Sequence, residues 1–314
     1  RLLKGKQSCL LAFDESIALK HGIKSMRYFQ TEKKKQDPIT WQLEFLNTRL
    51  KENRSAFFTY SMLQQNQRAK RPFYPRTLLD FKMGKKNPYD IPKQNGEIRI
   101  VACDMAFVEN KHNDNSIFSC MRLLPECTTY SRNSAEDIKV DNGYRRIVPY
   151  LESVQGGDVT KQAIRIRELF EDFNADYIVL DLRNAGIAIY DLLAKVMYDE
   201  ERGVEYPPLL CMNDDTVASR IKIEGAKPCI FVINATQKLN SDIALDFRRV
   251  LETKKIDLLV TFEQANEEIL PNIKEYINSP NPDEQMFYEA PFFETQALIS
   301  ETTDLVYEKK EQTG

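Results

Sequence analysis

Histidine and cysteine are scarce in this chain, which has two histidines and six cysteines in 314 residues. The cysteines are spread along the chain without any Cys-x-x-Cys pair: Cys9, Cys103, Cys120, Cys127, Cys211 and Cys229. This scatter gives little support to the common zinc sites and predicts reduced core thiols in a cytosolic setting. With only His21 and His112, histidine-based nucleophilic catalysis has little support. Any catalysis would therefore depend on carboxylates.

Two further absences narrow the functional classes. No apolar run approaches the ~18 residues of a membrane span, so we expect no membrane association. The pattern Gly-x-x-x-x-Gly-Lys-Ser/Thr is also missing, although Lys4–Ser8 looks superficially like a phosphate loop. We therefore expect no nucleotide binding and no ATPase activity. The acid pair Asp14 and Glu15 is then expected at a helix N-terminus. With 42% apolar residues, the length suits about two soluble domains.

Two short apolar runs each lead directly into an aspartate. Residues 98–103 precede Asp104 and are broken only by Arg99, and residues 177–180 precede Asp181. Both runs predict interior strands covered on two faces. A carboxylate there needs a hydrogen bond, a salt bridge or a cation. For one aspartate alone, turn capping or solvation would suffice.

The order of the surrounding segments makes it more plausible that Asp104 and Asp181 act together. A polar turn over 110–115 separates the first strand from an apolar stretch over 117–124, and 144–154 has the mixed pattern of an edge strand. After Gly156-Gly157, Asp158 is placed to cap a helix that crosses to the strand ending at Asp181. Such a crossover makes the two strands parallel and brings Asp104 and Asp181 to one sheet edge.

The remaining elements complete an α/β pattern. Residues 186–197 predict an amphipathic helix, and 229–233 predict a further buried strand. The expected order is βββαβαβ, with a three-strand antiparallel meander followed by parallel strands. Ser241 is placed to cap a helix over 242–251, and Pro271 is expected either to open or to kink a helix.

This order of elements, with Asp104 after the first strand and Asp181-Leu-Arg-Asn-Ala-Gly186 after the fourth, resembles the RNase H-like nuclease domain of the large terminase subunit of tailed bacteriophages. The resemblance covers residues 98–314. Residues 1–67, which include Trp41-Gln-Leu-Glu-Phe-Leu-Asn47, resemble the end of the ATPase domain that precedes it, as a mainly helical accessory region. Residues 68–97 form a basic, proline-containing linker.

The resemblance implies a two-metal endonuclease that cuts concatemeric double-stranded DNA during genome packaging. Asp104 would bridge two Mg²⁺ or Mn²⁺ ions and Asp181 would hold one. Two divalent ions about 3.5 to 4 Å apart can activate a water and stabilise the leaving oxygen of a phosphodiester. The implied partners are DNA, the portal protein and the small terminase subunit. The implied location is the host cytoplasm, transiently on the procapsid, with oligomers only in the assembled motor.

The chain departs from the family pattern at the third acidic ligand, which the family carries on a helix after a β-hairpin. Residues 305–314 are interpreted as the first arm of that hairpin, so the third carboxylate is expected beyond Gly314 and the nuclease domain is expected to be incomplete. Glu301 and Asp304 are weak substitutes, more simply explained as solvated. Arg1 is not an initiator methionine, and the chain is accordingly interpreted as a fragment.

Several groups keep two interpretations. Arg183 and Asn184 could face a scissile phosphate or structure the loop. Asp214 and Asp215 could bind a metal, but turn chemistry is favoured. The eight basic residues of 68–93 could track a phosphate backbone or belong to a solvated connector that wraps the first strand. A non-catalytic module that docks DNA or the portal is the alternative to an endonuclease, and a junction resolvase or transposase core is the alternative within nucleases.

Overall fold

The computed structural model describes most of the chain from residue 56 onward. The described residues are 21, 23–25, 28, 56–85, 87, 89–106, 115–132, 138–155, 158–183 and 185–305, with side chains left out at 126–132, 138–142 and 155. The chain divides into two compact units, one made of residues 1–60 and 303–314 and the other of Ser61–Thr302. Residues 1–55, 110–114, 156–157 and 306–314, about which the sequence makes several predictions, lie almost wholly outside the described residues.

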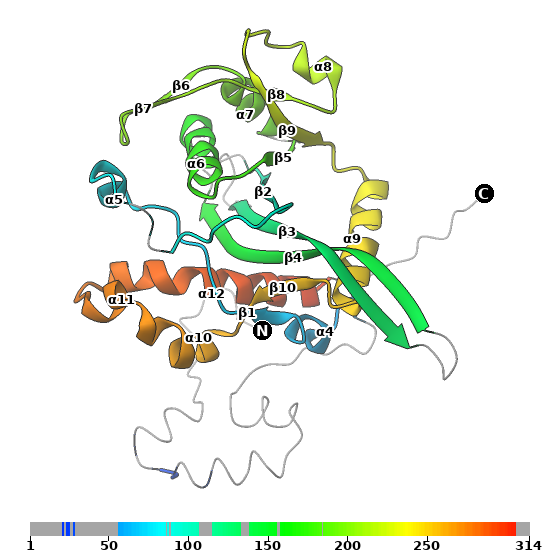
Figure 1. Cartoon of the computed structure of the whole chain (residues 1–314), viewed down its shortest axis with the longest axis vertical. Helices are drawn as coiled ribbons and strands as arrows, with labels where there is room; N and C mark the ends of the chain where they lie inside the picture. The colour runs from blue at the N-terminus through cyan, green and yellow to red at the C-terminus, as the bar shows by residue number, and fades with distance from the viewer. Residues whose placement is uncertain are drawn as a thin grey trace, which may run out of the picture. The chain divides into compact units, whose positions relative to one another are not determined.

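The second unit is built on an eight-stranded sheet in the order β1-β10-β4-β3-β2-β5-β9-β8 (Figure 1). Its strands are β1 (Gln67–Ala69), β2 (Ile98–Asp104), β3 (Asn115–Arg132), β4 (Ile138–Gln155), β5 (Tyr177–Asp181), β8 (Leu209–Cys211), β9 (Lys227–Ile233) and β10 (Ile256–Leu259). β2, β3 and β4 are antiparallel, whereas β5 and β9 continue parallel to β2. This mixed sheet, flanked by helices, has an RNase H-like α/β fold, as predicted.

Helices join and flank these strands. They are α4 (Tyr60–Gln64), α5 (Leu78–Lys82), α6 (Val159–Asp172), α7 (Gly186–Leu193), α8 (Asp215–Ala218), α9 (Gln237–Glu252), α10 (Phe262–Glu268), the 3-10 helix η1 (Leu270–Asn272), α11 (Lys274–Asn278) and α12 (Pro282–Thr303). Asp158 caps α6 as predicted, because its side chain accepts from the Thr160 N–H at 2.8 Å. Pro271 lies in the first turn of η1 and therefore opens a helical turn.

The main core lies between the sheet and the two helices of the crossovers, α6 and α7. Residues of β2 and β5 that point to this side are fully buried: Val101, Cys103, Ile178 and Leu180. The other side of the same strands is only half-buried, so the prediction that they are covered on both faces is wrong. That half-open side leaves room for a pocket.

Three predictions about element boundaries also require correction. β4, which includes residues 144–154, is not an edge strand, because β10 pairs with it in parallel through Ile256 and Arg146. α7 ends at Leu193 instead of reaching Met197, where the short strand β6 (Met197–Asp199) begins and pairs with β7 (Val204–Tyr206). The predicted order βββαβαβ also lacks β6, β7 and β8, three strands of three residues each.

Ion pairs attach the basic segment 68–93 to this unit. Four of its cations lie within 4 Å of a carboxylate outside the segment, Arg68 with Asp257, Lys70 with Glu268, Arg76 with Asp172 and Lys93 with Asp176, and Lys85 pairs with Asp80 inside it. The Arg71 guanidinium donates to the Asp90 carbonyl at 3.0 Å. Because these partners offset most of the positive charge, the contacts favour a connector that is part of the fold over a phosphate-tracking strap. The domain boundaries at 67 and 97 stay predictions.

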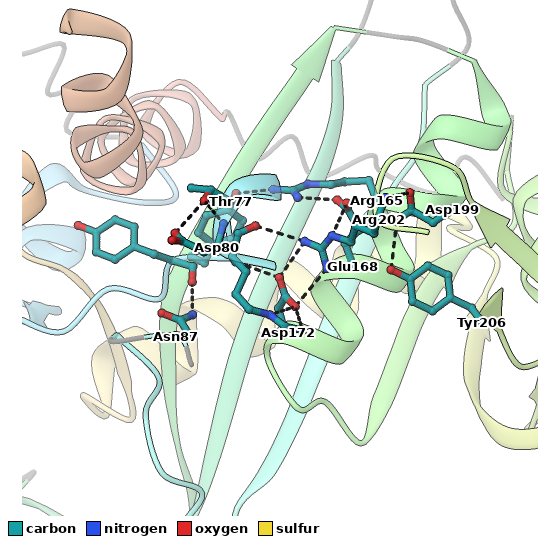
Figure 2. A network of polar contacts seen from close by, with 12 residues as sticks. Thr77, Asp80, Asn87, Arg165, Glu168, Asp172, Asp199, Arg202 and Tyr206 are labelled. Carbon is teal, nitrogen blue, oxygen red and sulfur yellow. Dashed lines mark hydrogen bonds and ion pairs between the residues drawn. The ribbon is translucent and has the colours of Figure 1, made fainter. Parts of the chain in front are cut away.

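The most buried of these pairs joins the segment to α6. Figure 2 shows Asp172 and Glu168, both on α6, facing Arg202. The Asp172 carboxylate, whose side chain is fully buried, accepts from Arg76 at 2.6 Å and from Arg202 at 3.0 Å. The two guanidinium groups also lie over the Phe81 ring of α5, at 4.5 and 4.6 Å from its centroid. Asp172 thus ties α5 and the β6–β7 hairpin to the crossover helix.

Candidate functional site

The strand register brings Asp104 and Asp181 together. β2 and β5 pair in parallel, with Cys103 opposite Leu180, so the next residue on each strand is an aspartate. Neighbouring strands lie about 4.8 Å apart, and residues in register point to the same side of a sheet. Both aspartates line one pocket of about 280 Å³ on the half-open side, opposite α6 and α7. Their metal-binding and catalytic roles stay predictions.

Small and apolar side chains form the rest of the sheet wall of this pocket. One row across the sheet reads Ile117, Asp104, Asp181 and Ile233, and the row behind it reads Ser119, Ala102 and Val179. Ser119 and Ala102 in the second row have short side chains, so they project less from the sheet than the first row does. The two carboxylates, which lie between two isoleucines, are therefore accessible to a charged ligand in the pocket.

The loop after β5 holds the Asp181 carboxylate in place. The Arg183 backbone N–H donates to Asp181 Oδ1 at 3.1 Å, and the Leu182 N–H donates to the Ile233 carbonyl at 2.9 Å. Arg183 thus structures the loop through its backbone, while its side chain is exposed. Asn184, the other residue predicted here, lies outside the described residues.

Helix α9 supplies the wall of the pocket that sequence reasoning missed. The predicted cap at Ser241 is wrong, because Thr236 caps the helix by accepting from the Leu239 N–H at 3.2 Å. The helix therefore starts at Gln237, five residues before the predicted start, and Asn240 and Ile243 line the pocket beside the two aspartates. The spacing of Leu239, Ile243 and Phe247 at every fourth position is the signal that could have revealed this longer helix.

The donor set of the pocket suits a hard divalent cation. Two carboxylates and an amide oxygen are the ligand types that Mg²⁺ and Mn²⁺ prefer. The neighbouring Cys103 thiol is a poor competitor, because burial and then the Asp104 charge raise its pKa well above the ordinary range. A buried protonated thiol does not offer a thiolate ligand.

A third carboxylate does not join the pair within the described part of the chain. No group of three or more His, Cys, Asp or Glu side chains there could hold a metal ion. Glu301, in the last turn of α12, and Asp304 are exposed and do not line the pocket. Asp214 caps α8 by accepting from the Thr216 N–H at 2.9 Å, which supports turn chemistry for that pair. The expected ligand beyond Gly314 stays a prediction.

The structure also bears on the predictions about the cysteines and about membrane spans. Among the cysteines whose side chains the structure describes, Cys103, Cys120, Cys211 and Cys229 are free and buried, as core thiols should be. None of the helices formed by the described residues combines the length and the apolar character that a membrane crossing needs.

Comparisons with known proteins find similarity at the level of solved structures. No family model matches the chain, and no curated protein is similar to it. The crystal structure of the large terminase nuclease from thermophilic phage G20c is similar at 15% sequence identity. The alignment covers 63% of this chain and 72% of that chain, with a TM-score of 0.29.

Proposed function

We propose that the chain is a metal-dependent endonuclease that hydrolyses phosphodiester bonds at the Asp104 and Asp181 pocket. The observation that carries the proposal is the placement of two strand-end carboxylates side by side, on the open face of an RNase H-like sheet. The other residues that line this pocket are apolar or uncharged, so the two carboxylates supply its charge.

Each residue of the pocket has a defined part in this proposal. A bound Mg²⁺ or Mn²⁺ ion would lower the pKa of a water and stabilise the leaving oxygen. Asp104 and Asp181 would hold the cation, and the Arg183 backbone N–H keeps one Asp181 oxygen fixed so that the other is free to bind. The short side chains of Ala102 and Ser119 leave space for a phosphate beside the carboxylates.

The finer proposal is that the enzyme belongs to the motor that packages viral DNA. It rests on the sequence resemblance to terminase nuclease domains. The resemblance is carried by Asp104 after the first strand of this chain and by the Asp181–Gly186 signature after the fourth. On this proposal the substrate is concatemeric double-stranded DNA, two ions are used, and the portal and small terminase subunit are partners. The protein would act in the host cytoplasm, transiently on the procapsid.

The experiment is plasmid cleavage in Mn²⁺ by the chain and by two variants, Asp104→Asn and Asp181→Asn. Asp215→Asn is the matched control, because it removes the same charge from an exposed residue outside the pocket. We expect both pocket variants to lose cleavage at least a hundredfold while their circular dichroism is unchanged, and the control to retain it. Equal cleavage by all four proteins would refute the proposal and favour a non-catalytic docking module.

A second substrate separates the competing nucleases. A junction resolvase would prefer a four-way DNA junction over linear duplex of the same sequence, whereas a packaging nuclease should cut the duplex without needing a branch. The two substrates can be compared under the same Mn²⁺ conditions. A strong preference for the junction would replace the packaging role and leave the metal-dependent chemistry intact.

A further inference from the structure

Asn240 is an amide for which the fold shows no structural use. It is the fourth residue of α9 and lines the pocket with Asp104 and Asp181. Within the described part of the chain we find no hydrogen bond of its side chain, and it is exposed. Asn213 provides the contrast, because its amide accepts from the Val232 N–H and donates to the Val232 carbonyl, both at 2.8 Å.

The chemistry of an amide next to two carboxylates allows two roles. The NH₂ group could donate to a carboxylate and simply hold it, or the carbonyl oxygen could bind the same cation as the carboxylates. No hydrogen bond from Asn240 to either aspartate is present, although the Asp181 carboxylate does accept from the Arg183 backbone N–H. The amide oxygen is therefore available, and oxygen is the donor that a hard cation requires.

We propose that Asn240 supplies a further protein ligand, beside Asp104 and Asp181, to the cation at this pocket. This inference rests on the proposed function and names a residue that neither the sequence resemblance nor the strand-end pattern includes. Its consequence is electrostatic. Asn240 contributes an oxygen without a charge, so it strengthens cation binding less than a carboxylate at the same position would. The position on α9 is then the place where one substitution can tighten binding.

The test measures Mn²⁺ binding directly, through the loss of the free-ion electron paramagnetic resonance signal, on the whole chain. The variants are Asn240→Asp, which adds a charged oxygen, and Asn240→Leu, which removes the oxygen at similar volume. Ser241→Asp is the matched control, because it adds the same charge to the next residue of α9, which does not line the pocket. Circular dichroism checks that each variant is folded.

We expect the dissociation constant for Mn²⁺ to fall about tenfold in Asn240→Asp and to rise several-fold in Asn240→Leu. In Ser241→Asp it should change by less than about twofold, because a charge without ligation acts only through solvent. Equal binding by the wild type and Asn240→Leu would overturn the inference, as would equal gains in the two aspartate variants.

The result also separates this inference from the proposed function. If Asp104→Asn abolishes Mn²⁺ binding and Asn240→Leu does not weaken it, the pocket binds metal without Asn240, and only the inference fails. If neither the wild type nor Asn240→Asp binds Mn²⁺ at millimolar concentration, the metal site itself is wrong, and the proposed function fails together with the inference.

Discussion

Gly186 lies directly against the backbone carbonyl of Asp181. A Cβ atom added at Gly186 would be 1.8 Å from the Asp181 oxygen and 2.8 Å from its carbon, far inside contact distance. The first turn of α7 can therefore approach the end of β5 only because residue 186 has no side chain. This contact gives a physical meaning to the Asp-x-x-x-x-Gly spacing, because the glycine determines where the loop after Asp181 runs.

The Gly186→Ala variant should disturb the pocket through this contact. The methyl group has to push the backbone carbonyl of Asp181 away, so we expect a loss of about 1–3 kcal/mol in the free energy of unfolding and weaker Mn²⁺ binding. Urea unfolding and Mn²⁺ titration measure the two effects. Gly225→Ala is the control, since its Cβ would meet no atom within 4 Å, so that any loss there comes from its backbone φ of 78° and not from a clash. Unchanged Mn²⁺ binding in Gly186→Ala would contradict the role given to this contact.

Removing the charge of Asp172 should be costly. Its buried carboxylate is shared by Arg76 and Arg202, and Asp172→Asn would remove the counter-ion of Arg76 and leave Arg202 with Glu168 alone. We expect a loss of about 3–5 kcal/mol in the free energy of unfolding. Asp191→Asn breaks the more exposed pair with Arg220 and should cost about 0–1 kcal/mol. Urea denaturation followed by circular dichroism compares the two, and similar losses would show that burial does not determine the strength of these pairs.

Glu97 should make stability depend on acid pH. Burial alone would raise its pKa, but hydrogen bonds from Arg122, the Gln94 backbone and Arg99 outweigh burial and lower the pKa to about 2. Because this value is below the ~4.3 of an unfolded glutamate, the stabilisation is complete above pH ~4.3 and is lost as the pH falls through about 2.

The pH dependence can be isolated with a Glu97→Gln variant. The free energy of unfolding of the wild type should fall by on the order of 3 kcal/mol more than that of the variant between pH 4.5 and 2. Above pH 5 the variant should be the less stable protein, because Arg99 and Arg122 lose their shared partner. Parallel pH profiles for the two proteins would exclude Glu97 as the source of this acid sensitivity.

The cap at Thr236 should control the first turn of α9. Thr236→Ala removes the hydroxyl that accepts from the Leu239 N–H, at a cost of about 1 kcal/mol. Amide hydrogen exchange at residues 239 and 240 should become faster. Thr261→Ala removes the equivalent cap of α10, where the hydroxyl accepts from the Gln264 N–H, and should cost a similar amount without changing exchange in α9. Unchanged exchange at 239 and 240 in Thr236→Ala would mean that packing alone holds this turn.

The sequence predicts the centre of the fold better than its borders, for a physical reason. β2 and β5 are apolar runs that end in a charge, and their pairing follows from the crossover through α6. The position of β4 could not be predicted, because its second neighbour β10 comes from about 100 residues later in the chain. β10 also contains Asp257, which looks unsuited to a buried strand until Arg68 and Arg145 are found beside it.

The same limit applies to the pocket. Its two carboxylates are local features of two strands, and the element order alone indicates that they meet. From the sequence, Ser241 is the predicted cap of this helix, so Asn240 is expected to lie before its first turn. Its neighbours along the chain do not distinguish Asn240 from any other polar residue. Only the packing of α9 beside the sheet places Asn240 next to Asp104 and Asp181.

The pairing of β1 with β10 has a consequence for how the protein is made. β1 is synthesised before β10, yet the Gln67 amide donates to the Leu259 carbonyl, 192 residues further along the chain. Until that partner is synthesised, β1 has no strand to join and the outer side of β4 is unpaired. The sheet is therefore completed only after β10 has been synthesised, and during that delay the exposed edge of β4 is where a nascent chain is most open to chaperones or to mispairing.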